Sequence, residues 1–222
     1  MIKSTFLNTK NQNSGMLIST DLLSMVREDI LKGKYQQGYK LTELQICSEY
    51  NVSRTPVREA LRQLEMEGLV ETKPNRGAFV IGFSMQDIRD MFDLRKCYEI
   101  QAVKWGIERI TDDELDALEE TFEFMEFYTQ KNDIEKVLNI NTNFHQIIYI
   151  ATHNRMLHNI LSSYQLYMKH VKASHTLNSD FLLLLEEHRE IYNAFKDKDI
   201  SCGIKAIEKH MDNSIERYFL LK

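Results

Sequence analysis

The sequence predicts a mainly α-helical protein, in which a small domain of short helices and a β-hairpin precedes an all-α antiparallel helical bundle. Seven of the eight glycines and both prolines lie before residue 107, so tight turns are confined to the front of the chain. From residue 84 onward, apolar residues recur at helical spacing with only short joints between segments. The 222 residues allow two domains, which we place at 16–82 and 83–222, after a polar tail over 1–15 that we expect to be disordered.

The composition is that of a globular protein, with 43% hydrophobic and 27% charged residues. No apolar stretch reaches the length of a signal peptide or a membrane span, so we expect no membrane partner. The three cysteines are odd in number and widely spaced, and no Cys-x-x-Cys pair occurs. This pattern argues against a disulfide framework and favours the reducing cytoplasm.

The net charge of −5 is unevenly distributed along the chain. Residues 1–82 carry 11 Lys and Arg against 9 Asp and Glu, whereas residues 83–222 carry 17 against 24. A mildly basic first third on an acidic body suggests that the first third contacts a polyanion. Ordinary fluctuation would produce the same split, so charge alone does not decide the function.

Two helices open the first domain. Apolar residues from Leu22 to Leu31 recur at helical spacing and predict a first helix that ends near Gly33. Thr42 is the expected N-cap of a second, shorter helix. That helix ends at Asn51, because asparagine tolerates the left-handed conformation that a sharp turn requires.

A third helix follows, with Ser53 as its expected N-cap and Pro56 in its first turn, where the missing N–H is harmless. Arg54, Arg58 and Arg62 recur every four residues and therefore project from one outer side of the helix. Such a row on its own is more often a solvated surface. The surrounding turn, cap and hairpin favour a nucleic-acid contact instead.

A β-hairpin with a basic tip completes the domain. Extended segments at 69–72 and 78–81 bracket the sequence Lys-Pro-Asn-Arg-Gly over 73–77. Three helices and this hairpin make a winged helix-turn-helix, whose third helix enters the major groove of DNA. Arginine can donate two hydrogen bonds to guanine, and Arg76 on the wing would reach a phosphate or the minor groove.

The nine residues from Ser53 to Leu61, with Gly68-Leu69-Val70 and Arg76-Gly77, resemble the DNA-binding domain of the GntR family of bacterial transcription regulators. The resemblance covers roughly residues 18–82 and departs at Gln37-Gly38, where the family usually has Pro-Gly. It implies base contacts from arginines of the third helix, a phosphate contact from Thr55 and a wing tip shaped by Gly77. The candidate DNA-binding residues are Ser53, Arg54, Thr55, Arg58, Arg62, Arg76 and Gly77.

The remainder of the chain predicts six helices with short loops, which form a bundle whose interior can host a ligand. Thr111 and Glu114 form an expected capping box, and Asn178-Ser179 an expected joint. The expected helices cover residues 84–110, 111–130, 133–151, 155–174, 179–196 and 200–220.

Three histidines in this bundle are candidate metal ligands. His145 lies mid-helix with Asn141 one turn before it on the same face, and His188 and His210 lie in the last two helices. If the bundle closes around them, their neutral imidazoles can hold a divalent cation with positions left for a ligand. A lone helical histidine is more often a core or surface residue, so spacing alone leaves both interpretations open.

A second, more scattered pattern over residues 84–220 resembles the FCD effector domain of the FadR-type branch of the GntR family. It implies a zinc, nickel or manganese site, in which Asn141 takes the place of the aspartate that many such domains have. Asparagine removes one negative charge, so the resemblance implies weakened metal affinity. The residues that carry the resemblance are Arg95, Glu99, Ala102, Phe144, His145, Asn154, His188, Ile191, Ala194, Asp199, Ala206 and His210.

Arg95 resembles an arginine that faces the cavity in such domains, where it would hold an effector carboxylate by a two-point salt bridge. A surface ion pair with Glu99, four residues further on, is an equally good interpretation. The sequence leaves the choice open.

These features predict a homodimeric transcription regulator that binds a palindromic DNA operator and responds to a small organic acid, rather than an enzyme. Repression relieved by the effector is the commoner arrangement that the resemblance implies. One alternative is a metal-dependent helical hydrolase. The sequence argues against it, because it contains neither an H-E-x-x-H motif nor a nucleophile motif. The other is a helical interaction module without a ligand, which leaves residues 53–77 unexplained.

Overall fold

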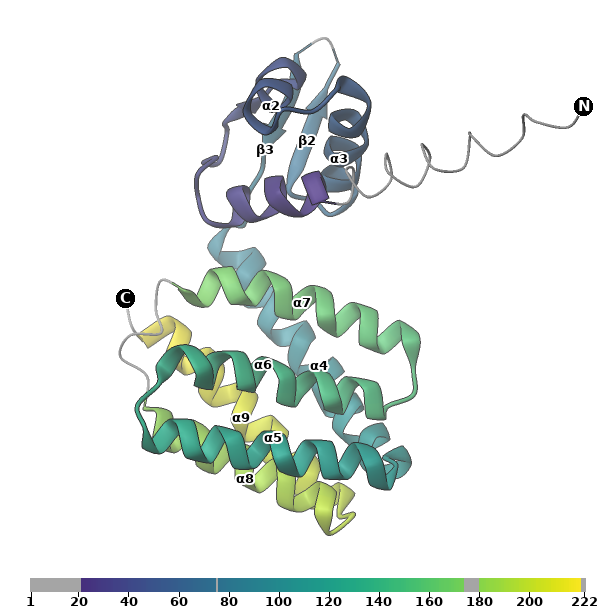
Figure 1. Ribbon diagram of the computed structural model, residues 1–222, viewed down its shortest axis with the longest axis vertical. Helices are drawn as coiled ribbons and strands as arrows, with labels where there is room; N and C mark the ends of the chain where they lie inside the picture. The colour runs from purple at the N-terminus through teal and green to yellow at the C-terminus, as the bar shows by residue number, and fades with distance from the viewer. Residues whose placement is uncertain (1–20, 75, 174–179, 221–222) are drawn as a thin grey trace, which may run out of the picture. The chain divides into compact units, whose positions relative to one another are not determined.

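The computed structural model describes residues 21–74, 76–173 and 180–220 (Figure 1). The chain divides into two compact units, Met1–Met85 and Gln86–Lys222. Both are dominated by helices, as the sequence predicts. The expected tail over 1–15 and the expected joint at Asn178-Ser179 lie outside the described residues.

The first unit contains the predicted helices and hairpin. The described part of its first helix covers residues 21–31. The three strands form an antiparallel sheet in the order β1-β3-β2. The elements that follow the first helix are β1 (Lys40–Leu41), α2 (Glu43–Tyr50), α3 (Arg54–Met66), β2 (Val70–Lys73) and β3 (Gly77–Val80).

Strand β1 was not predicted from the sequence, and the two hairpin strands lie one residue away from their predicted positions. Lys40 pairs with Phe79 and Leu41 with Ala78, so this two-residue strand exists only through its register with β3. Two residues carry no periodicity of their own, which is why only the folded sheet reveals the strand.

The turn between α2 and α3 has the predicted geometry. The Thr42 hydroxyl accepts a hydrogen bond from the Gln45 N–H, and Asn51 adopts the left-handed conformation with φ 52° and ψ 49°. Ser53 occupies the N-cap position of α3, but its hydroxyl caps no N–H among the described residues. The predicted N-cap position of Ser53 is therefore confirmed, and the extended backbone conformation is typical of an N-cap, but the expected side-chain hydrogen bond is absent.

One face of α3 is fixed against the rest of the unit. Val57, Ala60 and Leu64 are buried on its inner face. At its end, Glu67 accepts two hydrogen bonds of 2.7 and 2.6 Å from Arg27 of the first helix. These contacts hold α3 so that its opposite face remains outward.

The second unit is an all-helical bundle, as predicted. Thr111 and Glu114 form the expected capping box. Asn132, His153 and Lys198 take positive φ angles near 50° at three expected joints. The helices are α4 (Met85–Arg109), α5 (Asp112–Gln130), α6 (Ile134–Ala151), α7 (Arg155–Ala173), α8 (Phe181–Lys196) and α9 (Ile200–Leu220).

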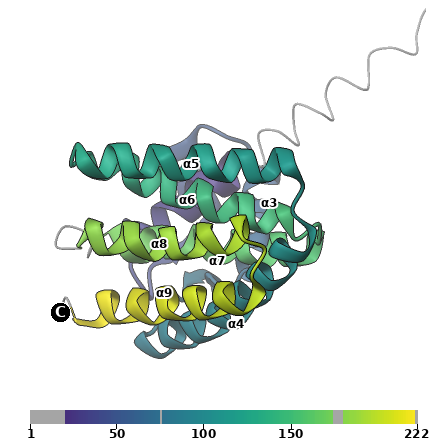
Figure 2. The same ribbon diagram turned by 90° about the horizontal axis from the view of Figure 1, so that it is seen from below.

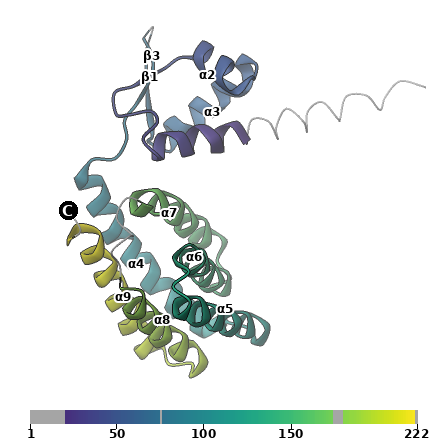
Figure 3. The ribbon, with the colours of Figure 1, turned by 60° about the vertical axis from the view of Figure 1, so that its left-hand side comes forward.

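Helix α5 packs against α6 and α8, α9 packs against α8, and α7 packs against α6 (Figure 2). Helix α4 lies along α9, where the Phe92 and Tyr218 rings are 5.4 Å apart and Lys96 pairs with Asp212 (Figure 3). The shared core is apolar apart from a group of buried polar side chains from α4, α6, α8 and α9. Across the described residues, we find no helix that combines the length and the apolar character needed to traverse a bilayer.

Candidate nucleic-acid interface and metal centre

The outward face of α3 presents the predicted arginines. Arg54, Arg58 and Arg62 are all exposed, and so are Ser53 and Thr55 at the start of the helix. The first turn of a helix offers unsatisfied N–H groups and a partial positive charge, which suit a phosphate oxygen. The exposed donors at the start of α3 therefore lie where the helix itself attracts negative charge.

The helix and the wing contribute to one concave surface. Arg58 and Arg62 of α3 line a hollow of about 540 Å³ together with Arg76 and Gly77 of the wing. Arg54 does not line this hollow and lies at the exposed N-terminal end of α3. Three of the arginines predicted to bind DNA therefore line the same hollow, and Lys40 of β1 adds a fourth positive charge to it.

Gly77 allows the close approach at the base of the wing tip. Its φ of 96° is strained for any residue with a side chain, and an added Cβ would lie 3.2 Å from Cε of Lys40. Gly77 also pairs with Lys73, the last residue of β2. A glycine at this position therefore lets the hairpin close against β1.

Arg58 donates a 2.7 Å hydrogen bond from Nε to Oε1 of Glu43 on α2. This contact lowers the pKa of the Glu43 carboxyl and raises the pKa of the Arg58 guanidinium. The Arg58 side chain is 64% exposed, and ion pairs in water contribute little free energy. The pair therefore orients the Arg58 side chain but costs little free energy to break.

In the helical unit, the structure brings the three predicted histidines together. His145, His188 and His210 come from α6, α8 and α9, and all three are buried. One ring nitrogen of each lies within 4.8 Å of the nitrogens of the other two. Such a cluster can hold a divalent cation.

The neighbours of the imidazoles determine which nitrogen faces the cluster. The Nδ1 atom of His188 lies 2.7 Å from the Leu184 carbonyl, which only accepts, so Nδ1 carries the proton. His210 Nδ1 lies 2.8 Å from Oε2 of Glu187, and His145 Nδ1 lies 3.4 Å from Oε2 of Glu99. His188 and His210 therefore have an oxygen acceptor behind the ring, as metal-binding histidines do, whereas the longer approach of His145 to Glu99 is not a hydrogen bond.

Several atoms of this cluster are buried without a hydrogen-bond partner among the described residues. They are both ring nitrogens of His145 and Nε2 of His188, and Oδ1 of Asn141, one turn before His145 on α6, is a further such atom. A buried polar atom without a partner costs about 1–3 kcal/mol, so a group of them indicates a ligand. Imidazole nitrogens and an amide oxygen suit a divalent first-row cation, and the residues therefore fit one.

The protonation state also suits a metal. Burial, reinforced by the imidazoles of His210 and His145, lowers the pKa of His188 well below its usual range. A neutral imidazole has the lone pair that ligation requires.

Arg95 and Glu99 form an ion pair, as one of the two interpretations of the sequence predicts, but the pair is buried and not on the surface. Their side chains are 5% and 0% exposed, and Arg95 donates to Oε1 of Glu99 from Nε at 3.0 Å and Nη2 at 2.8 Å. Tyr149 donates to the same oxygen at 2.5 Å. Burial would raise the pKa of Glu99, but His145 and Arg95 outweigh it and keep the carboxyl ionised.

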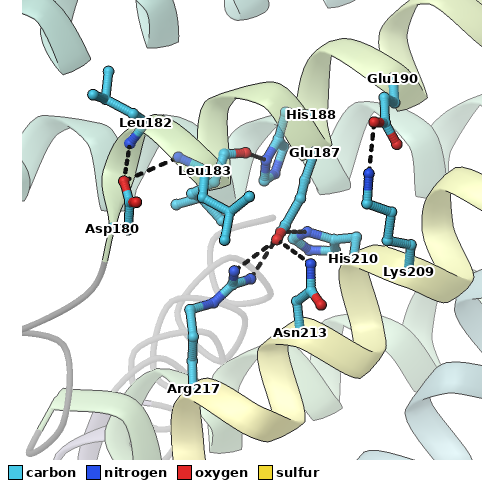
Figure 4. Close-up of polar contacts among 11 residues, drawn as sticks. Asp180, Leu182, Leu183, Glu187, His188, Glu190, Lys209, His210, Asn213 and Arg217 are labelled. Atoms are coloured by element: carbon cyan, nitrogen blue, oxygen red, sulfur yellow. Dashed lines mark hydrogen bonds and ion pairs between the residues drawn. The ribbon is translucent and has the colours of Figure 1, made fainter.

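Glu187 is a second buried carboxylate that the sequence analysis did not single out (Figure 4). It accepts hydrogen bonds from His210, Asn213 and Arg217 of α9. Burial alone would raise its pKa, but hydrogen bonds from His210 and Arg217 lower it to about 2. Glutamates at core positions of an otherwise apolar helix face were the signal that could have identified Glu99 and Glu187.

Both units match known protein families. Residues 19–80 match the family model of bacterial regulatory proteins of the gntR family, and residues 90–213 match the FCD domain. This chain belongs to the GntR family, in its FCD-domain branch. The matched domains and relatives of this GntR regulator are transcription regulators and not enzymes.

Two curated relatives match most of the regulator. The transcriptional repressor RspR of Escherichia coli K12 is 24% identical over 200 residues, covering 90% of this chain and 88% of RspR. The gluconate operon transcriptional repressor of Bacillus subtilis is 28% identical over 199 residues, covering 85% and 79%.

Solved structures share the fold of the regulator. The McbR/YncC protein of E. coli has a TM-score of 0.70 at 21% identity, covering 93% of this chain and 97% of that protein. A Listeria monocytogenes structure, described as Lar controlling the agr system, has a TM-score of 0.68 at 17% identity and covers the full length of both chains.

Proposed function

We propose that this GntR regulator binds a palindromic operator as a homodimer and represses transcription until a small organic acid binds its FCD domain. The observation that supports the DNA contact is the hollow shared by Arg58, Arg62 and Arg76. Repression is proposed because both RspR and the gluconate operon protein are named as repressors. Such a regulator acts on chromosomal DNA, and therefore in the cytoplasm.

The residues of the first unit divide into base-reading and backbone-contacting groups. Arg54 and Arg58 read bases in the major groove, where arginine recognises guanine O6 and N7. Ser53 and Thr55 at the start of α3 contact a phosphate. The remaining contacts come from Arg62 and from the wing residues Arg76 and Gly77.

In the FCD domain, His145, His188 and His210 would hold a zinc, nickel or manganese ion, with the Asn141 oxygen as a fourth ligand. When bound, the ion supplies a Lewis-acidic positive charge that attracts a carboxylate. The chain itself orients the imidazoles through Glu99 and Glu187. Arg95 contacts the Glu99 oxygen that does not face His145, and we assign its guanidinium to recognition of the effector carboxylate.

Effector binding would control DNA affinity through a difference between two conformational states. A ligand shifts such an equilibrium only by its difference in affinity for the two states. Reciprocity then requires that operator binding change the affinity for the effector by the same factor.

Arg58→Ala tests the DNA-binding surface. An operator is first selected from a randomised duplex library with the full-length protein, and we expect two half-sites related by two-fold symmetry. Loss of a bidentate base contact should then cost about 1–3 kcal/mol, which is roughly 5- to 150-fold in Kd measured by fluorescence anisotropy. Arg189→Ala, an arginine of the FCD domain that pairs with Glu126, is the control and should leave operator affinity unchanged. Unchanged affinity in Arg58→Ala would overturn the assignment of α3 as the recognition helix.

A further inference from the structure

We infer that Asn213 and Arg217 are positioning residues for the metal centre, which act through Glu187 to hold the His210 imidazole in one orientation. The inference rests on the proposed metal function of the histidine cluster. It assigns a role to two residues of α9 that lie beyond the cluster itself.

Glu187 is held by donors on both of its carboxylate oxygens (Figure 4). Its side chain is 1% exposed. Oε1 accepts from Asn213 Nδ2 at 2.7 Å and from Arg217 Nη1 at 2.7 Å. Oε2 accepts from Arg217 Nη2 at 2.8 Å and lies 2.8 Å from His210 Nδ1. The two-pronged contact of the Arg217 guanidinium therefore fixes the plane of the Glu187 carboxylate. The carboxylate in turn accepts a hydrogen bond from Nδ1 of His210.

The spacing of the donors on α9 explains why they meet one acceptor. His210, Asn213 and Arg217 are three and then four residues apart, so they lie on one face of the helix. Glu187 comes from the facing helix α8, next to the candidate ligand His188. Because a carboxylate only accepts, it favours the tautomer with the proton on Nδ1 and leaves Nε2 as the ligating nitrogen.

Without the fork of Arg217, the Glu187 carboxylate loses the contact that fixes its plane. It can then rotate, and the His210 ring is no longer held with Nε2 directed to the cluster. Outer partners of metal-binding histidines typically account for 10- to 100-fold in metal affinity. If these residues only joined α8 to α9, their substitution would change the folding stability but not the metal affinity.

The chain provides a matched control for the structural alternative. Lys209 and Glu190 also link α9 to α8, with a 2.7 Å ion pair one residue before His210. Their side chains are 52% and 48% exposed, and neither hydrogen-bonds to a candidate ligand. Lys209→Ala therefore removes an α8–α9 link and leaves the support of His210 intact.

The experiment measures the Zn²⁺ dissociation constant of the full chain by competition with a chromophoric chelator. We expect Arg217→Ala and Asn213→Ala to weaken binding by about 10- to 100-fold and about 10-fold, respectively. Arg217→Lys should restore only part of the loss, because lysine cannot make the two-pronged contact. Lys209→Ala should bind as the wild type does.

A second readout uses the metal-free protein, whose fold is checked by thermal denaturation. Imidazole ¹⁵N spectra of the wild type should show His210 as a single Nδ1–H tautomer, and Arg217→Ala should show a mixture. Unchanged Zn²⁺ affinity and tautomer in Arg217→Ala would overturn the positioning role. A wild-type chain that binds no Zn²⁺ would instead overturn the proposed metal centre, and its imidazole spectra would still decide the orientation of His210.

Discussion

At the scale of single residues, the distribution of charge distinguishes the histidine cluster. Its candidate ligands are three imidazoles and the neutral amide of Asn141, whereas the negative charges lie one layer behind. Glu99 and Glu187 carry those charges, and both are engaged by arginines. A cation at this site would therefore meet neutral donors, with a buried carboxylate behind the His210 ring and another close to the His145 ring.

Asn141→Asp should tighten Zn²⁺ binding and destabilise the metal-free protein. The Asn141 oxygen is buried without a partner among the described residues, so a carboxylate there adds direct attraction for a cation. Opposite charges near a protein site attract by roughly 1–4 kcal/mol, so we expect a gain of about tenfold or more. Without metal, the unpaired charge is costly and the melting temperature should fall.

Chelator competition and thermal denaturation with and without a chelator measure the two effects. Asn139→Asp, at an exposed position of the same helix, is the control and should change neither quantity appreciably. A weaker metal complex in Asn141→Asp would show that position 141 does not contribute a ligand.

At the scale of secondary-structure elements, close contacts hold the helices around the cluster. Gly106 on α4 lies against the Phe195 ring of α8, and Gly203 on α9 lies against Ile107 and Val103 of α4. An alanine Cβ at Gly106 would lie 2.9 Å from the Phe195 ring. Small residues thus set how closely α4 approaches α8 and α9, two of the helices that carry the histidines.

Gly106→Ala should lower the free energy of unfolding by up to about 2 kcal/mol. The gain in helix propensity is about 1 kcal/mol, whereas overpacking a rigid core costs about 1–3 kcal/mol. Urea denaturation measures the difference. Asn143→Ala, an exposed change on α6 that gains propensity without a clash, should be neutral or stabilising. Equal stabilisation by both substitutions would contradict the tight contact.

A different kind of contact ties the first helix to α2. Lys34 pairs with both Asp29 and Glu49, and Tyr50 donates a hydrogen bond to Asp29. Burial raises the pKa of Asp29, but hydrogen bonds from Lys34 and Tyr50 outweigh it, and the net shift is downward. The pKa of Glu49 is lowered chiefly by its hydrogen bond from Lys34.

This network should lose its stabilising effect in acid. The folded-state pKa values lie below the ordinary values of 3.8 for Asp29 and 4.5 for Glu49, so the network stabilises the fold above those values. Its contribution is lost as pH falls through the folded-state values. Asp29→Asn should therefore lower the free energy of unfolding at pH 7 by up to about 1 kcal/mol. Between pH 7 and pH 3, the free energy of unfolding of the variant should fall by less than that of the wild type. Parallel pH profiles for the variant and the wild type would contradict this assignment.

At the scale of the whole molecule, the chain combines a DNA-binding unit with an FCD domain, and each has its own charged centre. The first unit presents exposed arginines on α3, which suit a polyanion, whereas the second unit carries a buried histidine cluster, which suits a divalent cation. A ligand that binds only the folded state stabilises it by mass action, by about 2.7 kcal/mol at a concentration of 100 Kd.

Removal of metal should therefore destabilise the whole chain measurably. Elemental mass spectrometry of untagged protein, purified without chelator, is expected to find about one divalent ion per chain. A chelator should lower the melting temperature of this protein but not that of His188→Ala, and it should change operator affinity. No ion after reconstitution, together with no thermal shift across a panel of metabolites, would favour a ligand-free interaction module.

The sequence alone determined the helices, the caps at Thr42 and Thr111 and the outward arginine row, because these depend on neighbours within a few turns. Thr42, Asn51 and the Thr111 capping box act locally, and the period of 3.6 residues separates Arg58 from Val57. The match to the two family patterns also required no coordinates, since it depends on the order and spacing of residue types along the chain.

Only the tertiary structure decided which distant side chains meet. The β1 strand depends on pairing with β3, and the burial of Arg95 and Glu99 depends on helices packed around α4. Glu187 accepts hydrogen bonds from Arg217, which lies 30 positions further along the chain, and no local pattern specifies that contact. Periodicity gives the face of each helix, whereas the rotation and approach of one helix against another come from packing the whole core.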